Sequence, residues 1–252
     1  MVQNDRRALR LVHLYPDLLN LYGDRGNIIT LLRRCQWRGI PLTVERVSLH
    51  DRFAFADADL VFMGGGSDRE QTLLFQDFQQ HKGPALVEAA EAGLPLLSVC
   101  GGYQLLGRYY RTHTGEEMPG LGFFDAWTEA GSTRLIGNVV AEAPLLGEGM
   151  GLVGFENHSG RTFLGDRGGI QPLAQVIAGQ GNNGKDKGEG AVYKNAIGTY
   201  LHGPVLPKNP ALADWLLARA LERRYGDGSL TPLADRWEQS AHDAVARRFA
   251  SR

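Results

Sequence analysis

Short apolar runs that alternate with helix-spaced segments most constrain what this chain can fold into. The runs at 9–14 and 94–99 read as buried strands, and the segments at 42–47 and 59–63 alternate like strands. Helical patterns occupy the intervals at 25–38, 69–81, 84–92 and about 102–110. This alternation predicts an α/β fold, flavodoxin-like, with a mainly parallel sheet flanked by helices.

The rest of the chain is less regular. Asp24 is expected to cap the helix at 25–38. The glycine-rich middle favours short strands at 121–127, 135–142, 151–157 and 171–178. A hairpin over 191–201 and two helices, about 208–225 and 231–249, complete the chain. We therefore expect one domain over 1–205, with a helical extension over 206–252 packed on it.

Composition excludes several classes of protein. The 252 residues carry a net charge of −1 and include only two cysteines, Cys35 and Cys100. No basic field points to nucleic acid, and a disulfide framework is not expected. Neither a signal peptide nor an apolar run long enough to span a membrane is present. We expect a reduced, cytoplasmic protein without direct membrane insertion.

Cys100 is the candidate nucleophile. It follows the apolar run at 94–99 and precedes Gly101-Gly102, so a strand meets a helix at a tight turn. Such an elbow exposes the side chain at the carboxyl edge of the sheet, and the helix N-terminus favours a thiolate. The N–H of Gly101 is placed to donate to an oxyanion. The simpler interpretation is a small buried hydrophobic residue, as most lone cysteines are.

A base and a second oxyanion donor have candidates elsewhere. His202 ends the strand-like segment IGTYLH and should reach the same sheet edge as Cys100. His158, within FENHSGRT, is the rival base. Gly64-Gly65-Gly66 follows the run at 59–63 and permits a backbone N–H to face the site. Spacings typical of metal sites and the GxxxxGK[ST] phosphate loop are absent, so we expect no metal and no ATP in this chain.

These motifs resemble those of a known family. VCGGYQ at 99–104 resembles the nucleophile elbow of class I glutamine amidotransferases, and MGGG at 63–66 resembles their oxyanion loop. TYLHGP at 199–204 is similar to the histidine motif of the cobyric-acid-synthase-like branch. Further segments resemble the glutaminase subunits of lipid II isoglutaminyl synthases: 14–40, 63–71, 133–138 and 155–162.

The resemblance implies a function. Cys100 would attack the side-chain amide of L-glutamine, and His202 would act as base and acid. Gly65 and Gly101 would hold the oxyanion, Arg134 would bind the α-carboxylate, and Gln104 would bind substrate or brace the elbow. Ammonia would pass to a Mur-ligase-like synthetase in a heterodimer. That partner would hold ATP and Mg²⁺ and amidate the D-glutamate α-carboxyl of lipid II.

The resemblance also leaves one catalytic position open. Gly203 and Pro204 follow His202, so the usual acidic residue two positions on is missing. An acid from the partner is expected to complete the triad, with Glu156 as the candidate within this chain. Three alternative functions remain: amidation of another acceptor such as a cobyrinate-type corrinoid, a non-catalytic scaffolding subunit, and a cysteine peptidase.

Overall fold

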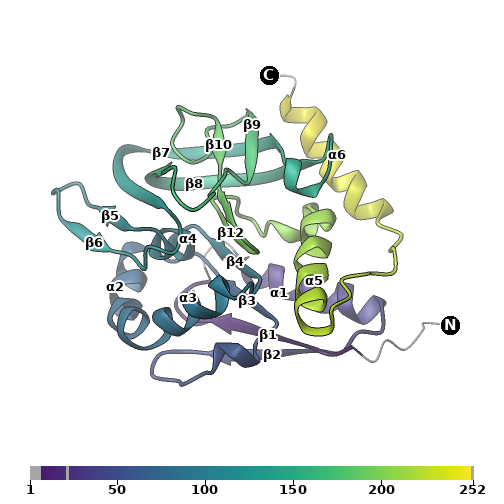
Figure 1. Ribbon diagram of the computed structural model, residues 1–252. Coiled ribbons are helices and arrows are strands. Elements are labelled where there is room, and N and C mark those ends of the chain that lie inside the picture. The colour runs from purple at the N-terminus through teal and green to yellow at the C-terminus, as the bar shows by residue number, and fades with distance from the viewer. Residues whose placement is uncertain (1–6, 21–22, 251–252) are drawn as a thin grey trace.

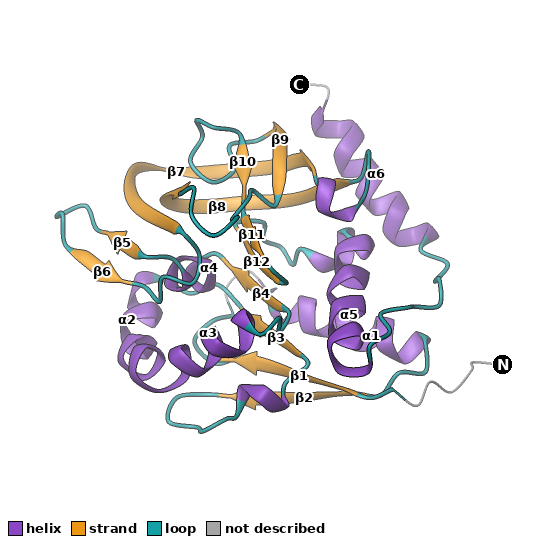
Figure 2. Cartoon of the chain, in the orientation of Figure 1, coloured by secondary structure: helices purple, strands orange, loops and turns teal. Residues whose placement is uncertain are grey.

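The first of two sheets carries the parallel strands that the sequence predicts (Figures 1 and 2). The computed structural model describes residues 7–20 and 23–250. Five strands run parallel, and β11 pairs antiparallel with β12 at one edge. The order across this sheet is β11 (Ala191–Tyr193), β12 (Ala196–Thr199), β4 (Leu96–Val99), β3 (Leu60–Met63), β1 (Leu9–Leu14) and β2 (Leu42–Val47).

Helices cover both faces of this sheet because side chains alternate along each strand (Figure 2). Leu9 and Leu11 belong to the apolar core shared with α1 (Arg25–Trp37) and α5 (Pro210–Tyr225). Val12 and Leu14 belong to the opposite core, which α2, α3 and α4 help to close. These helices span Asp68–Asp77, Gly83–Glu91 and Gly101–Leu106. The predicted α/β class with a mainly parallel sheet is confirmed.

Three of the predicted helical boundaries are wrong, one of them the start of the last helix, expected at 231 and found at Arg236. The helices expected at 69–81 and 84–92 form one continuous path, because the π-helical turn η3 (Phe78–Lys82) joins α2 to α3. Pro84 does not interrupt it, since proline is tolerated in the first turn of a helix. The helix after Cys100 ends at Leu106, and Tyr109–Arg111 forms strand β5 instead.

A second sheet, largely antiparallel, replaces the short strands expected in the middle of the chain. A long hairpin of β7 (Ala126–Glu142) and β8 (Gly151–Leu164) dominates it (Figure 1). The predicted strand at 121–127 is wrong for most of its length, and β7 continues through 131–134, where the register shifts. The other members are β5, β6 (Glu117–Pro119), β9 (Ala174–Ala178) and β10 (Gly188–Glu189).

The C-terminal helices pack on the rest of the chain. Arg34 of α1 is almost fully buried and donates bidentate hydrogen bonds to Asp214 of α5, at 2.6 and 2.7 Å. It also binds Asp235, directly before α6 (Arg236–Ala250), at 2.7 and 2.8 Å. One guanidinium therefore ties three segments together. The domain boundary at residue 205 stays a prediction. No helix within 7–20 and 23–250 is long and apolar enough to cross a bilayer.

Candidate active site

The backbone at Cys100 forms a strained elbow. Cys100 joins β4 to α4 with φ of 50° and ψ of −107°, a conformation that only glycine adopts freely. Its N–H donates to the carbonyl of Thr199, and its side chain is half-buried. A Cβ atom at Gly102 would lie 2.8 Å from the carbonyl oxygen of Gly64. Glycine is therefore required where the elbow passes beneath the Gly64–Gly66 loop.

Gly65 lies between the two candidate catalytic side chains. A Cβ atom added to it would be 3.2 Å from Cβ of Cys100 and 3.4 Å from Cε1 of His202. The ends of β3, β4 and β12, adjacent in the sheet, thus bring together the glycine loop, the cysteine and the histidine. Carboxyl ends of neighbouring parallel strands are where open α/β folds place their sites.

His202 is buried and anchored through its backbone. Its N–H donates to the carbonyl of Phe155 on β8, at 2.7 Å. Burial, together with the charges of His158 and Arg134, lowers the pKa of the imidazole to about 4. The ring is therefore neutral near pH 7 and can accept the proton of Cys100. The imidazolium that follows is disfavoured, because burial and the charges of His158 and Arg134 oppose it.

A pocket of about 370 Å³ opens beside Cys100, between the glycine loop and β8. Arg134 lies on its rim and is held in place by Asn157. Its Nε donates to the side-chain oxygen of Asn157 at 2.9 Å, and Nη2 donates to the Asn157 carbonyl at 2.8 Å. An arginine fixed in this way suits an anionic group, and its role in binding substrate stays a prediction. Asn157 carried no signal in the sequence beyond its place in FENHSGRT.

Gln104 is buried in a polar network beneath the pocket. Its amide donates to the Tyr200 hydroxyl at 3.0 Å, and this hydroxyl lies 2.6 Å from that of Thr162. On its other side, Gln71 donates to the Gln104 oxygen at 3.3 Å. The network braces the first turn of α4, and because Gln104 also lines the pocket, its contact with substrate stays a prediction. Gln71 also lines the pocket, although its sequence context did not mark it.

His158, the rival base, also lines the pocket. Its ring stacks on Tyr200 at a centroid distance of 3.7 Å, and Nδ1 lies 2.8 Å from the Gly160 carbonyl. Burial lowers the pKa of His158 to about 4, although the Gly160 carbonyl raises it. Its place in the stack suits a neutral wall of the pocket.

Glu156 does not occupy the position of a third triad member. Its two oxygens accept the backbone N–H groups of Gln180 and Gly181, at 2.9 and 2.8 Å. Burial raises the pKa of this carboxyl, and those two N–H groups lower it. Its charge is also not among those that shift the pKa of His202. Glu156 holds the 180–181 loop, and the acid expected from a partner stays a prediction.

Asp24 takes an unexpected place. It stands at the N-cap position of α1, but its side chain makes no capping hydrogen bond, so that prediction is wrong. Oδ2 accepts the Gly65 N–H instead, at 2.7 Å, and the side chain is completely buried. Burial raises the pKa of Asp24 to about 7, and the bond from Gly65 lowers it. The expected oxyanion donor is therefore already bound to a carboxyl group.

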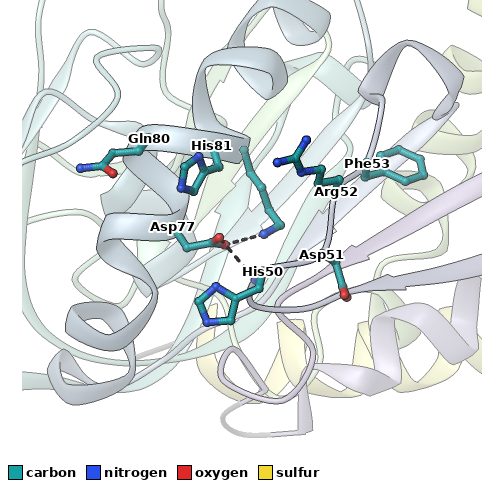
Figure 3. Close-up of a pocket in the computed structure, with 8 residues that line it drawn as sticks. His50, Asp51, Arg52, Phe53, Asp77, Gln80 and His81 are labelled. Carbon is teal, nitrogen blue, oxygen red and sulfur yellow. Dashed lines mark hydrogen bonds and ion pairs between the residues drawn. The ribbon is translucent and has the colours of Figure 1, made fainter.

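A second pocket, of about 510 Å³, lies at the β2 side of the fold around His50, Asp77 and His81 (Figure 3). Burial raises the pKa of Asp77, but hydrogen bonds from Lys82 and Tyr15 outweigh it, and the pKa is lowered overall. Asp77 thus joins α2 to the end of β1. Cysteine is absent from the lining of this pocket, so it has no counterpart to the Cys100 nucleophile.

Comparison with known proteins agrees with this arrangement. Residues 10–210 match the model of the CobB/CobQ-like glutamine amidotransferase domain. The chain belongs to this family. Within it, the chain is 47% identical over 216 residues to a subunit from Staphylococcus aureus strain N315, the lipid II isoglutaminyl synthase (glutamine-hydrolyzing) subunit GatD. The match covers 86% of each chain.

Other relatives and structures extend the comparison. The subunit of the same name from Streptococcus pneumoniae strain R6 is 41% identical over 225 residues, covering 89% of this chain and 85% of that one. The crystal structure of a glutamine amidotransferase shares the fold, with a TM-score of 0.57 and 20% identity. That alignment covers 83% of this chain and 98% of the other.

Proposed function

We propose that this chain is the glutaminase subunit of a lipid II isoglutaminyl synthase. It hydrolyses L-glutamine and supplies ammonia to a Mur-ligase-like, ATP-dependent synthetase, which amidates the D-glutamate α-carboxyl of lipid II. The observation that carries this proposal is the convergence of the strained Cys100, Gly65 and His202 at one sheet edge. The two subunits of that name, similar over most of their length, support the acceptor.

In the proposed reaction, His202 takes the proton of Cys100, and the sulfur attacks the glutamine amide carbon. The N–H of Gly101 and that of Gly65 stabilise the oxyanion. The C–N bond breaks as His202 returns its proton to the leaving ammonia, which leaves a thioester on Cys100. His202 then takes a proton from water, and the hydroxide attacks the thioester. Glutamate departs as the C–S bond breaks, and His202 returns its proton to the Cys100 sulfur. Arg134 binds the α-carboxylate throughout.

The lowered pKa of His202 explains why a partner would be needed. Each turnover passes through an imidazolium, and burial beside His158 and Arg134 opposes that charge. A carboxylate supplied by the synthetase next to His202 would stabilise the imidazolium and fix its tautomer. The isolated chain is then a weak glutaminase that gains activity on assembly. Equal rates of glutamine hydrolysis with and without the synthetase would refute the dependence of activity on assembly.

The test uses the chain with its synthetase, purified from the same cells. We expect ATP-dependent amidation of lipid II with glutamine as nitrogen donor, and mass spectrometry of the stem peptide reports the change from carboxyl to amide. Cys100→Ala should abolish glutamine-dependent amidation but leave amidation with added ammonium intact. Cys35→Ala, at the other cysteine, which is buried, is the control.

Three outcomes would contradict the proposal. Glutamine-dependent amidation that survives in Cys100→Ala would indicate a scaffolding subunit. Amidation of a corrinoid carboxylate in place of lipid II would identify a different acceptor. Cleavage of peptides without ammonia release from glutamine would indicate a peptidase.

A further inference from the structure

The contact between Asp24 and Gly65 bears on the glutaminase reaction, and the inference drawn from it rests on the function proposed for this chain. We propose that Asp24 is a gate residue, which closes the oxyanion hole in the free chain and must release Gly65 before glutamine can react. Gly65 has one backbone proton, and Asp24 Oδ2 now accepts it at 2.7 Å.

The carboxyl oxygen lies where a reacting substrate needs space. A Cβ atom at Gly65 would be 3.4 Å from Asp24 Oδ2 and 3.2 Å from Cβ of Cys100, so the carboxyl group and the nucleophile flank the same glycine. An oxyanion formed on a Cys100 adduct would compete with the carboxylate for one donor. An oxyanion and a carboxylate at the same N–H group also repel each other, so the two contacts exclude one another.

The contact is held at one end only. Oδ1 of Asp24 is buried, and within 7–20 and 23–250 it has no hydrogen-bond partner. A carboxylate bound by one oxygen can be released by a side-chain rotation, without moving the elbow or the β3 strand. The gate is therefore local to the Asp24 side chain.

The structure also offers Asp24 an alternative position. It occupies the N-cap site of α1, where a carboxylate commonly accepts a backbone N–H of the first turn and meets the positive end of the helix dipole. That side-chain cap is unmade here. The backbone of Asp24 is helical here, with φ of −52° and ψ of −25°, so exchanging the Gly65 bond for a cap bond also requires its ψ to move to the extended region.

The α1 terminus is in contact with the histidine segment as well. A Cβ atom at Gly26 would lie 2.3 Å from Cγ of Pro204, two residues after His202. A movement of the His202–Pro204 turn on assembly would thus displace the first turn of α1, beside Asp24. The contact between Gly26 and Pro204 therefore links the segment of Asp24 to the segment of His202.

The test measures ammonia release from L-glutamine by the purified chain alone. Asp24→Ala leaves the Gly65 N–H open, and one oxyanion donor is worth about 10²–10³ in kcat. We expect kcat to rise about tenfold or more, with KM little changed. Asp24→Asn keeps an acceptor but removes the charge, so its kcat should lie between the two. Asp17→Ala removes a carboxylate of the same segment that binds Arg46 and Ser48, and should leave the rate unchanged.

Failure of the gate and failure of the proposed function give different results. If wild type releases ammonia through Cys100 but folded Asp24→Ala is no faster, Asp24 braces the loop and the gate is wrong. If Asp24→Ala does not fold, an Asp24→Asn rate above wild type supports the gate, and a rate at or below it overturns it. If no variant releases ammonia, alone or with the synthetase, the glutaminase function and the gate fail together.

Discussion

Glu189 offers a sharp test of the electrostatics around the site. This residue of β10 is completely buried, and its Oε1 accepts the Thr199 hydroxyl at 2.5 Å and the Tyr200 N–H at 3.0 Å. It thereby ties the second sheet to the segment that leads into His202. Burial raises the pKa of Glu189 to about 7, against 4.5 for an ordinary glutamate, while the bonds from Thr199 and Tyr200 lower it. Glu189→Gln keeps the shape and removes the titration.

The shift in the pKa of Glu189 sets the sign and the size of the change in the free energy of unfolding with pH. Because the folded pKa is raised, the folded state is favoured below the unfolded pKa of 4.5, and this advantage is lost as pH rises towards about 7. A shift of about 2.5 units at 1.36 kcal/mol per unit amounts to about 3 kcal/mol. Between about pH 5 and about pH 8, Glu189→Gln should therefore gain about 2.5 kcal/mol relative to wild type.

Thermal and urea unfolding at several pH values measure this difference. For a chain of this size, about 2.5 kcal/mol corresponds to a relative change in Tm of roughly 5–10 °C. A constant penalty from the introduced amide cancels, because only the pH dependence of the difference is compared. Glu148→Gln, on an exposed loop, is the matched control. A Tm difference between Glu189→Gln and wild type that does not change with pH would refute the reasoning.

Two further predictions concern arginines. Arg34→Met should destabilise the fold by about 3 kcal/mol, because the partly buried Asp214 and Asp235 carboxylates lose the guanidinium that pairs with both. Urea unfolding measures it against Arg33→Met, whose exposed side chain donates to Gln36 of the same helix. Equal losses in the two variants would contradict it. Arg134→Lys should raise KM for glutamine about tenfold with little change in kcat, since lysine lacks the planar fork. Steady-state kinetics of the complex report this, and an unchanged KM would exclude Arg134 from substrate binding.

The central sheet could be predicted because most of its parallel strands are short apolar runs, while β2 alternates apolar with polar residues. The long hairpin could not, because Gly131 and Ser132 look like a turn and yet lie within β7, where the register shifts. Pro84 likewise indicated a break, although the π-helical turn places it at the start of α3. In these cases tertiary packing overrides a local signal.

In the candidate site, too, residues with a local sequence signal could be predicted, and those placed by tertiary packing could not. Cys100, His202 and the three glycines have local signatures, and strand order alone predicts that they meet. The partner of the Gly65 N–H had no such signature, because Asp24 is distant in sequence and its local context favours a helix cap. Only the packing of α1 against the β3 loop places the two together. Asn157 and Gln71 were missed for the same reason.

The backbone of Cys100 sets activity against stability. A non-glycine residue at a φ of 50° and a ψ of −107° costs on the order of 1–3 kcal/mol, which the surrounding packing must offset. Glycine would relieve that cost and remove the nucleophile in the same substitution. Selection for stability alone would thus favour loss of the cysteine, so its retention in a lineage reports continuing selection for the reaction itself.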